Sequence, residues 1–313
     1  MKVAFLFAGQ YRYIPKKLFE NSLSNLTKGL EYDIFCFSWD EIGESLDHRE
    51  NVQFINNNDD VNVEKVSNIF EGFNLKKIQT ESYKKFINNL PMVYKKILNS
   101  SFYHKGTIFA LPQIYAISKC YKLLAFEEYE YDLIFRCRFD SLYIHPLNLY
   151  PLEKFKNSSS LYNINFGRAY YPFRVYDIFF GGSKRSMDFL DHIWINVPKL
   201  IENNFNNGLD KRDACRLIYL SAISNKTKIK TLKSRICDVY RPSKDNYYEK
   251  YILASHLLSM RIETFSLKII PYIIEWFIFR KINFIKLLLL IIKTSLLVPF
   301  SYLKRLIYFF DFK

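Results

Sequence analysis

The first forty residues contain the pattern that most restricts the fold of this chain: two apolar runs separated by a turn and a helix. Residues 3–7 form an apolar run that ends at Gly9, residues 15–30 are a predicted helix, and residues 33–39 form the second run. Two strands joined by one helix predict a right-handed parallel crossover. This unit is typical of nucleotide-binding α/β domains, because its glycine turn lets a ligand approach the backbone. The alternative is that Gly9 is a simple turn residue.

The central stretch, residues 131–144, reads YDLIFRCRFDSLYI. An apolar run precedes Arg136, Arg138 and Asp140, which stand at alternate positions. Alternate residues of a strand project to one face, so these three charges are predicted to line up at the end of one buried strand. Two cations and a carboxylate make poor core and suit a site that holds a phosphate, with or without a metal.

These residue types fit the binding of a sugar nucleotide. Asp140 is a candidate ligand for a divalent cation, Mn²⁺ or Mg²⁺, that bridges the diphosphate oxygens. Arg136 and Arg138 are candidates to clamp the phosphates with forked hydrogen bonds and to steady the leaving nucleoside diphosphate. The alternative for Arg138 and Asp140 is an ion pair that serves structure only.

The remaining pattern up to about residue 240 alternates strands and helices. Further strands are predicted at residues 52–55, 75–78, 161–165, 175–183 and 236–240. Further helices are predicted at residues 63–70, 83–97 with a break at Pro91, 109–126, 184–194 and 210–223. In the helix at 109–126, Gln113 lies off the apolar face and is compatible with ordinary surface. The glycine pair at 181–182 breaks its strand and permits either ligand approach or a tight connection.

Three polar segments, residues 9–12, 136–140 and 177–183, fall at predicted strand ends. Ligands of open α/β sheets bind outside the carboxyl ends of the strands, so we expect these segments to converge on one crevice, with Gly9 and Arg12 on its donor side. Asp177 and Asp213 are the candidates for a general base. Each has a structural alternative, Asp177 as a hydrogen-bonding residue at a strand edge and Asp213 in the first turn of a helix.

The composition narrows the class of protein. Lys and Arg exceed Asp and Glu by 14, so the surface should attract nucleotide phosphates, nucleic acid or an acidic membrane. The five cysteines form no C-x-x-C pair, which favours reduced thiols in the cytoplasm over disulfides or zinc. The first apolar run is too short for a signal peptide. No RNA-recognition or zinc-finger signature is present, so no nucleic-acid partner is expected.

The C-terminal segment differs from the rest of the chain. Residues 266–313 carry long aliphatic and aromatic runs punctuated by Lys and Arg. No uninterrupted run reaches the roughly 20 residues of a spanning helix, and the pattern fits a tail lying in the interface of an anionic membrane. A helical hairpin buried on the domain or in a dimer, and a single span over residues 287–303, are the alternatives. We predict a catalytic domain at residues 1–245 and a membrane-associated helical segment at residues 246–313.

Four segments together resemble bacterial surface-polysaccharide glycosyltransferases of GT-A type, near the WavE-like lipopolysaccharide synthesis proteins. They are KVAFLFAGQYR at 2–12, YDIFCFSWD at 32–40, YDLIFRCRFD at 131–140 and DIFFGGSxxxM at 177–187. The resemblance covers roughly residues 1–240 and implies a GT-A-like (Rossmann-like) α/β fold with a mostly parallel sheet flanked by helices. An R-x-R-x-D element stands in these families where D-x-D is usual, which implies donor-binding roles for Arg136, Arg138 and Asp140. Because D-x-D itself is absent, dependence on a metal and independence of one both stay open.

The main hypothesis is a glycosyltransferase in the cytoplasm, peripheral on the inner membrane. It moves a sugar from a nucleotide-sugar donor to a lipid-linked or saccharide acceptor of a lipopolysaccharide, capsule or other surface glycan. One alternative is a non-enzymatic basic protein that associates with membrane or nucleic acid. Another is a sugar phosphotransferase, which shares the phosphate-handling arginines and releases a sugar phosphate.

Overall fold

The computed structural model describes residues 1–12, 16–42, 61–99, 106–127, 130–143, 146–163, 175–204, 214–232 and 237–239. The chain divides into two units, Met1–Tyr240 and Arg241–Lys313, and the described residues all belong to the first. The predicted strand at 52–55 and the C-terminal tail lie outside the described residues, and the boundary at residue 245 stays a prediction. No helix within the described ranges is both long enough and apolar enough to cross a membrane.

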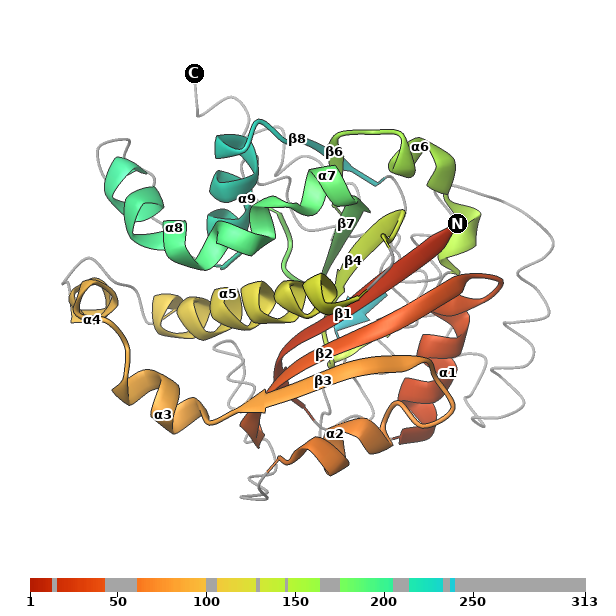
Figure 1. Cartoon of the computed structure of the whole chain (residues 1–313), viewed down its shortest axis with the longest axis horizontal. Coiled ribbons are helices and arrows are strands. Elements are labelled where there is room, and N and C mark those ends of the chain that lie inside the picture. Colours follow the sequence, from red (N-terminus) through yellow and green to blue (C-terminus); the bar gives the residue numbers. More distant parts are fainter. Residues whose placement is uncertain are drawn as a thin grey trace, which may run out of the picture. The chain divides into compact units, whose positions relative to one another are not determined.

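A seven-stranded sheet forms the centre of the first unit (Figure 1). Its strands are β1 (Lys2–Tyr11), β2 (Glu31–Ile42), β3 (Leu75–Glu81), β4 (Leu133–Cys137), β6 (Ser160–Asn163), β7 (Phe179–Ser183) and β8 (Lys228–Thr231). Their order is β3-β2-β1-β4-β7-β6-β8, in which β7 is antiparallel to both neighbours and the other pairs are parallel. The predicted α/β class with a mostly parallel sheet is therefore confirmed.

The opening unit folds as its pattern predicts. Helix α1 (Lys16–Thr27) connects β1 to β2, and the two strands pair in parallel from Lys2 opposite Glu31 onward. Alternate residues of β1 enter two different cores, with Leu6 on one side of the sheet and Phe5 on the other. Both faces of the strand are covered, which explains why it is a continuous apolar run.

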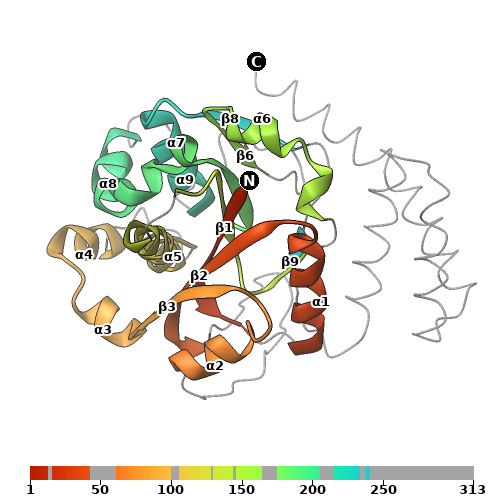
Figure 2. The same ribbon diagram turned by 45° about the vertical axis from the view of Figure 1, so that its right-hand side comes forward.

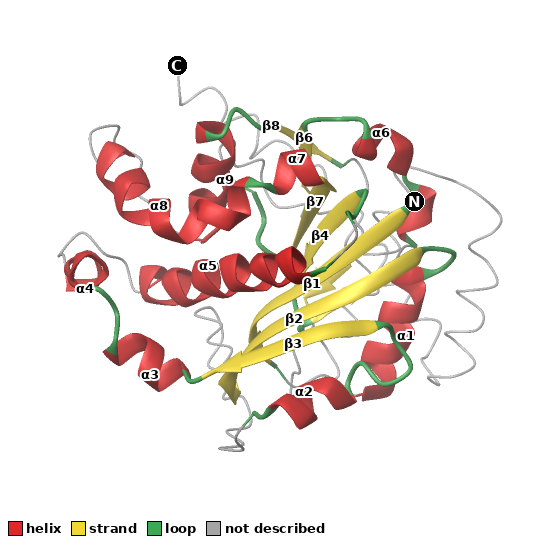
Figure 3. Cartoon of the chain, viewed as in Figure 1, coloured by secondary structure: helices red, strands yellow, loops and turns green. Residues whose placement is uncertain are grey.

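Helices cover both faces of the sheet (Figures 2 and 3). One core contains residues of α4 (Met92–Asn99), α5 (Gly106–Lys122), α8 (Phe189–Asn204) and α9 (Ala214–Ser224), and α3 (Tyr83–Asn88) packs against it. The other contains residues of α1, α2 (Val63–Asn68) and α6 (Leu152–Lys156). Pro91 separates α3 from α4 as predicted, whereas the helix predicted at 184–194 is two helices, α7 (Lys184–Met187) and α8.

The central stretch is not one strand, which corrects the sequence prediction. Strand β4 ends at Cys137, residues 139–140 form a turn, and β5 (Ser141–Tyr143) pairs with β9 (Cys237–Val239) in a separate two-stranded sheet. Arg138 and Asp140 therefore lie in the connection between two sheets. The alternation was misleading because Phe139, between these two charges, is itself buried and imitates the inward-facing residue of a strand.

The glycine pair lies inside β7 and does not break it. A Cβ atom on Gly181 would lie 2.7 Å from Cγ of Phe135, and one on Gly182 would lie 2.8 Å from the carbonyl oxygen of Ser160. The close approach at these glycines is therefore to neighbouring strands and to Ser186 of α7, and the predicted break is wrong.

Candidate functional site

The strand order of the sheet reverses between β1 and β4. The chain first adds β2 and β3 on one side of β1 and then places β4 on the other side, where both β2 and β4 run parallel to β1. Such a switch point leaves a crevice at the carboxyl ends of the strands. The antiparallel β7 starts at this same end, because Phe179 pairs with Cys137. We call this end of the sheet the carboxyl edge.

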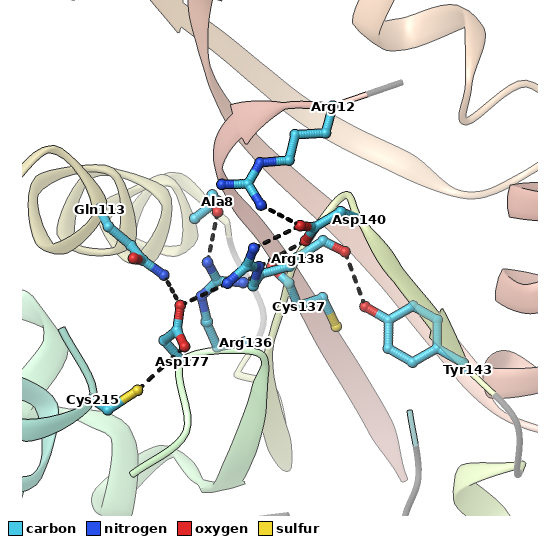
Figure 4. Close-up of polar contacts among 10 residues, drawn as sticks. All are labelled: Ala8, Arg12, Gln113, Arg136, Cys137, Arg138, Asp140, Tyr143, Asp177 and Cys215. Atoms are coloured by element: carbon cyan, nitrogen blue, oxygen red, sulfur yellow. Dashed lines mark hydrogen bonds and ion pairs between the residues drawn. The ribbon is translucent and has the colours of Figure 1, made fainter. Parts of the chain in front are cut away.

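The structure brings Arg12, Arg136, Arg138, Asp140 and Asp177 together at the carboxyl edge (Figure 4). Arg12 follows β1, Arg138 and Asp140 follow β4, and Asp177 precedes β7. These contacts bring residues of the three predicted segments together, and the crevice stays a prediction. Asp213 lies outside the described residues, and its role as a base stays a prediction.

Arg136 is part of the core at this edge. Its side chain lies within β4, its residue is 1% exposed, and its guanidinium donates to the carbonyl oxygen of Ala8, 2.7 Å away, and to that of Cys137. Burial lowers the pKa of this guanidinium. Arg136 thus ties the end of β1 to the end of β4, and this geometry does not fit the predicted phosphate clamp.

Arg138 and Asp140 form a forked ion pair. Nε of Arg138 donates to Oδ1 of Asp140 over 2.7 Å, and Nη2 donates to Oδ2 over 2.6 Å. Arg12 approaches the same carboxylate from β1, with 2.5 Å between its Nη1 and Oδ2. Such forked, charge-assisted bonds fix the plane of the guanidinium as well as its position.

Asp177 holds the other side of Arg138. Its Oδ2 accepts from Nη1 of Arg138 over 3.0 Å and also from the amide of Gln113, and its Oδ1 accepts from the thiol of Cys215 over 3.3 Å. Burial acts to raise the pKa of Asp177, but the charges of Arg138 and Arg136 outweigh it and lower that pKa below its usual value. A carboxylate with this pKa is a weak proton acceptor, so the geometry favours an orienting role over that of a general base.

Two partners of Asp177 were missed by sequence reasoning. Gln113 belongs to α5 and Cys215 to α9, and both contacts span more than thirty residues of chain. No local pattern marks them, since Gln113 reads as surface and Cys215 as one of five cysteines that form no C-x-x-C pair. Only the packing of α5 and α9 beside the start of β7 reveals their role.

The arginines dominate the exposed part of the cluster. Arg12 has a side chain 24% exposed and Arg138 one 15% exposed, compared with 12% for Asp177 and 4% for Asp140. Burial acts to lower the pKa of Arg138, but Asp140 and Asp177 more than offset it and raise that pKa, so the guanidinium keeps its charge. Three arginines and two aspartates leave a formal excess of one positive charge. We call the exposed part of the cluster, formed by Arg12 and Arg138, its opening. Its excess positive charge suits an anion.

Gly9 has a backbone that side chains rarely allow. Its φ is +122°, and the pairing of β1 with β2 shifts its register between Gly9 and Tyr11. A Cβ atom there would lie 3.9 Å from Nη2 of Arg136, so the conformation rather than the space requires glycine. The irregular end of β1 leads directly to Arg12, and a donor-binding role for Gly9 stays a prediction.

The donor set at Asp140 does not fit a divalent cation. Both carboxylate oxygens already accept hydrogen bonds from positively charged guanidinium groups. Among the described residues, no group of three or more His, Cys, Asp or Glu is placed to hold a metal ion. A hard cation prefers several oxygen ligands, and here it would meet one carboxylate between two arginines.

Fold and site together define an α/β domain with a cationic, arginine-rich cluster at the switch point of its sheet. No family model matches the sequence, and no curated protein matches it. Among solved structures, the chain is similar to mouse xyloside xylosyltransferase 1 in its apo form. The identity is 11%, the TM-score is 0.40, and the match covers 74% of this chain and 85% of that one.

Proposed function

We propose that the chain is a glycosyltransferase that takes its sugar from a nucleotide-sugar donor. The observation that carries this proposal is the pair of partly exposed arginines, Arg12 and Arg138, held by carboxylates at the switch point of the sheet. Switch points of open α/β sheets are where such folds bind nucleotides, and guanidinium groups are the side chains best suited to phosphate oxygens.

The reaction places specific demands on this site. An acceptor hydroxyl oxygen forms a bond to the anomeric carbon of the donor sugar, and the bond from that carbon to the diphosphate oxygen breaks. The leaving nucleoside diphosphate gains negative charge as this bond breaks, and preorganised cations stabilise that charge in the transition state. Arg138, fixed on two sides, and Arg12 at the opening supply these cations. The acceptor proton goes to a base, for which Asp213 stays the candidate.

The acceptor and the location form a further part of the proposal. The basic and apolar sequence of residues 246–313 supports a protein that lies on the cytoplasmic face of the inner membrane. An acceptor that is lipid-linked, or a saccharide of a surface glycan such as lipopolysaccharide or capsule, would be within its reach there. We expect the full chain to sediment with vesicles of anionic lipid, and a chain lacking residues 266–313 to stay in the supernatant with an unchanged melting temperature.

The function itself is tested with the full chain and a panel of UDP-, GDP- and CMP-sugars. We expect release of the nucleotide from one of them, and loss of that release in Arg138→Ala and Asp140→Ala, with Arg185→Ala as the matched control. Arg185 is an exposed arginine at the opposite end of β7, so its removal changes the charge equally and leaves the site intact. Full activity in Asp140→Ala, or no turnover of any donor by the folded protein, would contradict the proposal.

The same assay separates the alternatives. A sugar phosphotransferase would break the pyrophosphate bond of a UDP- or GDP-sugar, so a nucleoside monophosphate and a sugar phosphate product would appear in place of the nucleoside diphosphate. Tight, strongly salt-dependent binding of nucleic acid, together with no response to any sugar nucleotide, would identify a non-enzymatic basic protein.

A further inference from the structure

We infer that the site at the carboxyl edge binds the diphosphate of its donor without a divalent cation, through Arg12 and Arg138, with Asp140 and Asp177 as the residues that orient them. This inference rests on the proposed function, and it specifies how that site handles charge. It differs from the D-x-D arrangement, in which a carboxylate holds the cation that binds the phosphates.

Asp140 is the carboxylate that would have to hold the metal. Its side chain is 4% exposed, and it accepts a forked pair of bonds from Arg138 and a third bond from Arg12. A cation at this carboxylate would have to displace two guanidinium groups or lie against their positive charges. Asp140 is therefore an internal counterion of the arginines.

Arg138 has more N–H donors than its bonds to the two carboxylates use. A guanidinium carries five N–H donors. Three of those of Arg138 point to carboxylate oxygens of Asp140 and Asp177, which leaves two within the described part of the chain. Because the plane of the group is fixed on both sides, these two donors are aimed before any ligand arrives. Such preorganisation is what makes a charged group effective in a reaction.

The members of the cluster are anchored by several elements of the fold. Asp177 receives the amide of Gln113 from α5 and the thiol of Cys215 from α9, so the helical layer on one face of the sheet holds it in place. Arg12, which is the most exposed member, is held to Asp140 at the opening. An anion entering there meets cations whose positions are set by both the sheet and the helices.

The balance of charge in the cluster also disfavours a divalent cation. The five side chains already carry one excess positive charge, and a divalent cation would add two more in a partly buried place. Carboxylate oxygens are the protein ligands that hard cations prefer, and here the arginines outnumber the carboxylates. The charge that a metal would supply is already built into the chain.

Isothermal titration of the full chain with UDP, GDP, CDP and CMP, in EDTA and in saturating Mg²⁺ or Mn²⁺, tests this inference. Inorganic pyrophosphate in EDTA is the probe for the diphosphate alone. We expect a Kd for the nucleotide that changes less than about threefold between the two buffers. Arg138→Lys, which keeps the charge and loses the fork, and Arg12→Gln should weaken binding by about 10- to 100-fold in both buffers. Arg185→Gln should change it less than about twofold.

Arg12→Gln keeps the test valid if Arg138→Lys fails to fold, because Arg12 lies at the opening. Melting temperatures without ligand identify a misfolded variant. If Mn²⁺ tightens nucleotide binding more than about tenfold and Asp140→Asn removes that gain, the inference is wrong and the proposed function stands. If pyrophosphate binds in EDTA through Arg138 while no sugar nucleotide is bound or turned over, the metal-free anion site stands and the proposed function is wrong.

Discussion

Groups of charged side chains lie at both ends of the sheet and differ in their arrangement. At the carboxyl edge, three arginines and two aspartates converge. At the opposite end, which we call the amino edge, Lys156, Lys184 and Arg185 lie near Glu130 and Asp132. The amino edge has a cavity of about 330 Å³, lined by residues 156–159 and 183–185 with Asp132. A group of charged side chains alone therefore does not distinguish a site from ordinary surface.

The difference lies in burial and in the links between the charges. In the group of charges around this cavity, Lys184 pairs with Glu130, and their side chains are 51% and 82% exposed. Lys156 pairs with Asp132, and their side chains are 40% and 28% exposed. At the carboxyl edge one arginine joins two carboxylates, and a second arginine shares one of them. Exposed single pairs contribute little to stability, whereas losing one member of a buried network leaves its partners unsatisfied.

The largest expected effect is on the buried arginine of the carboxyl edge. Arg136→Met would leave the carbonyl oxygens of Ala8 and Cys137 without their donor and Asp177 without one of its compensating charges. We expect a loss of about 2–4 kcal/mol in the free energy of unfolding, measured with urea. Arg185→Met at the amino edge should stay within about 0.5 kcal/mol. Equal effects at the two positions would show that burial does not distinguish the two edges.

A second contrast uses one glycine from each edge. Gly9 has a φ of +122° at the carboxyl edge, and Gly29, in the turn before β2, has a φ of +70° at the amino edge. The φ of Gly29 lies in the left-handed region, which alanine adopts at a cost of about 1–2 kcal/mol. The φ of Gly9 lies outside that region and is less favourable for any L-residue with a side chain. We expect Gly9→Ala to cost about 1–3 kcal/mol and to weaken nucleotide binding, because β1 leads from this residue to Arg12.

Urea unfolding and ligand titration of both glycine variants check this prediction. A Cβ atom on Gly29 would lie 3.1 Å from Nδ2 of Asn148, so Gly29→Ala should lower stability. It should leave binding unchanged because Gly29 lies at the amino edge. Weaker binding in Gly29→Ala, or unchanged binding in Gly9→Ala, would show that the shape of the end of β1 does not set the site.

Lowering the pH should affect the contribution of each edge to the unfolding free energy differently, and this difference should be smaller than the effects above. The pKa of Asp177 is lowered in the folded state, so its charge contributes stability above the unfolded pKa of about 3.9, and that contribution is lost as pH falls through the folded pKa. The gap in unfolding free energy between the natural chain and Asp177→Asn should therefore be widest near neutral pH and should close below about pH 4.

Asp132→Asn is the matched control for the acid experiment at the amino edge. The pKa of Asp132 is also lowered, first by the hydrogen bond from Lys156. Its side chain is 28% exposed, compared with 12% for Asp177, so its gap should be smaller at every pH. Urea unfolding at a series of pH values measures both gaps. A pH-independent gap for Asp177→Asn would mean that its charge contributes nothing to folding.

The sequence predicts those elements whose buried residues form a regular apolar pattern along the chain. Strand β1 and the crossover to β2 are apolar on both faces, so their pattern is unambiguous. Strand β8 was missed because its four residues are mostly exposed. The turn at residues 139–140 was read as strand because the buried Phe139 maintains the alternation across it.

The site is predicted only where its residues are close in sequence. Arg138 and Asp140 stand two positions apart, and their motif is visible without a structure. The bonds of Asp177 with Gln113 and Cys215 depend on how two distant helices pack, and no local signal specifies that packing. The distinct role of Arg136 was hidden for a related reason, since a buried arginine and a phosphate-binding arginine look alike in a sequence.

The smallest expected effect concerns the coupling between single pairs of charges. A double-mutant cycle on Lys184 and Glu130, unfolded in urea at about 0.15 M salt, should give no measurable coupling, because both side chains are mostly exposed and solvent screens their attraction. The same cycle on Arg138 and Asp140 should give a clear coupling that changes little when salt is raised, because the pair is largely buried and screened less. If the exposed pair couples as strongly as the buried one, burial is not what separates the two edges. The orientation of Arg138 by Asp140 would then be no firmer than a surface contact, and the case for a preformed, metal-free anion site would lose its structural basis.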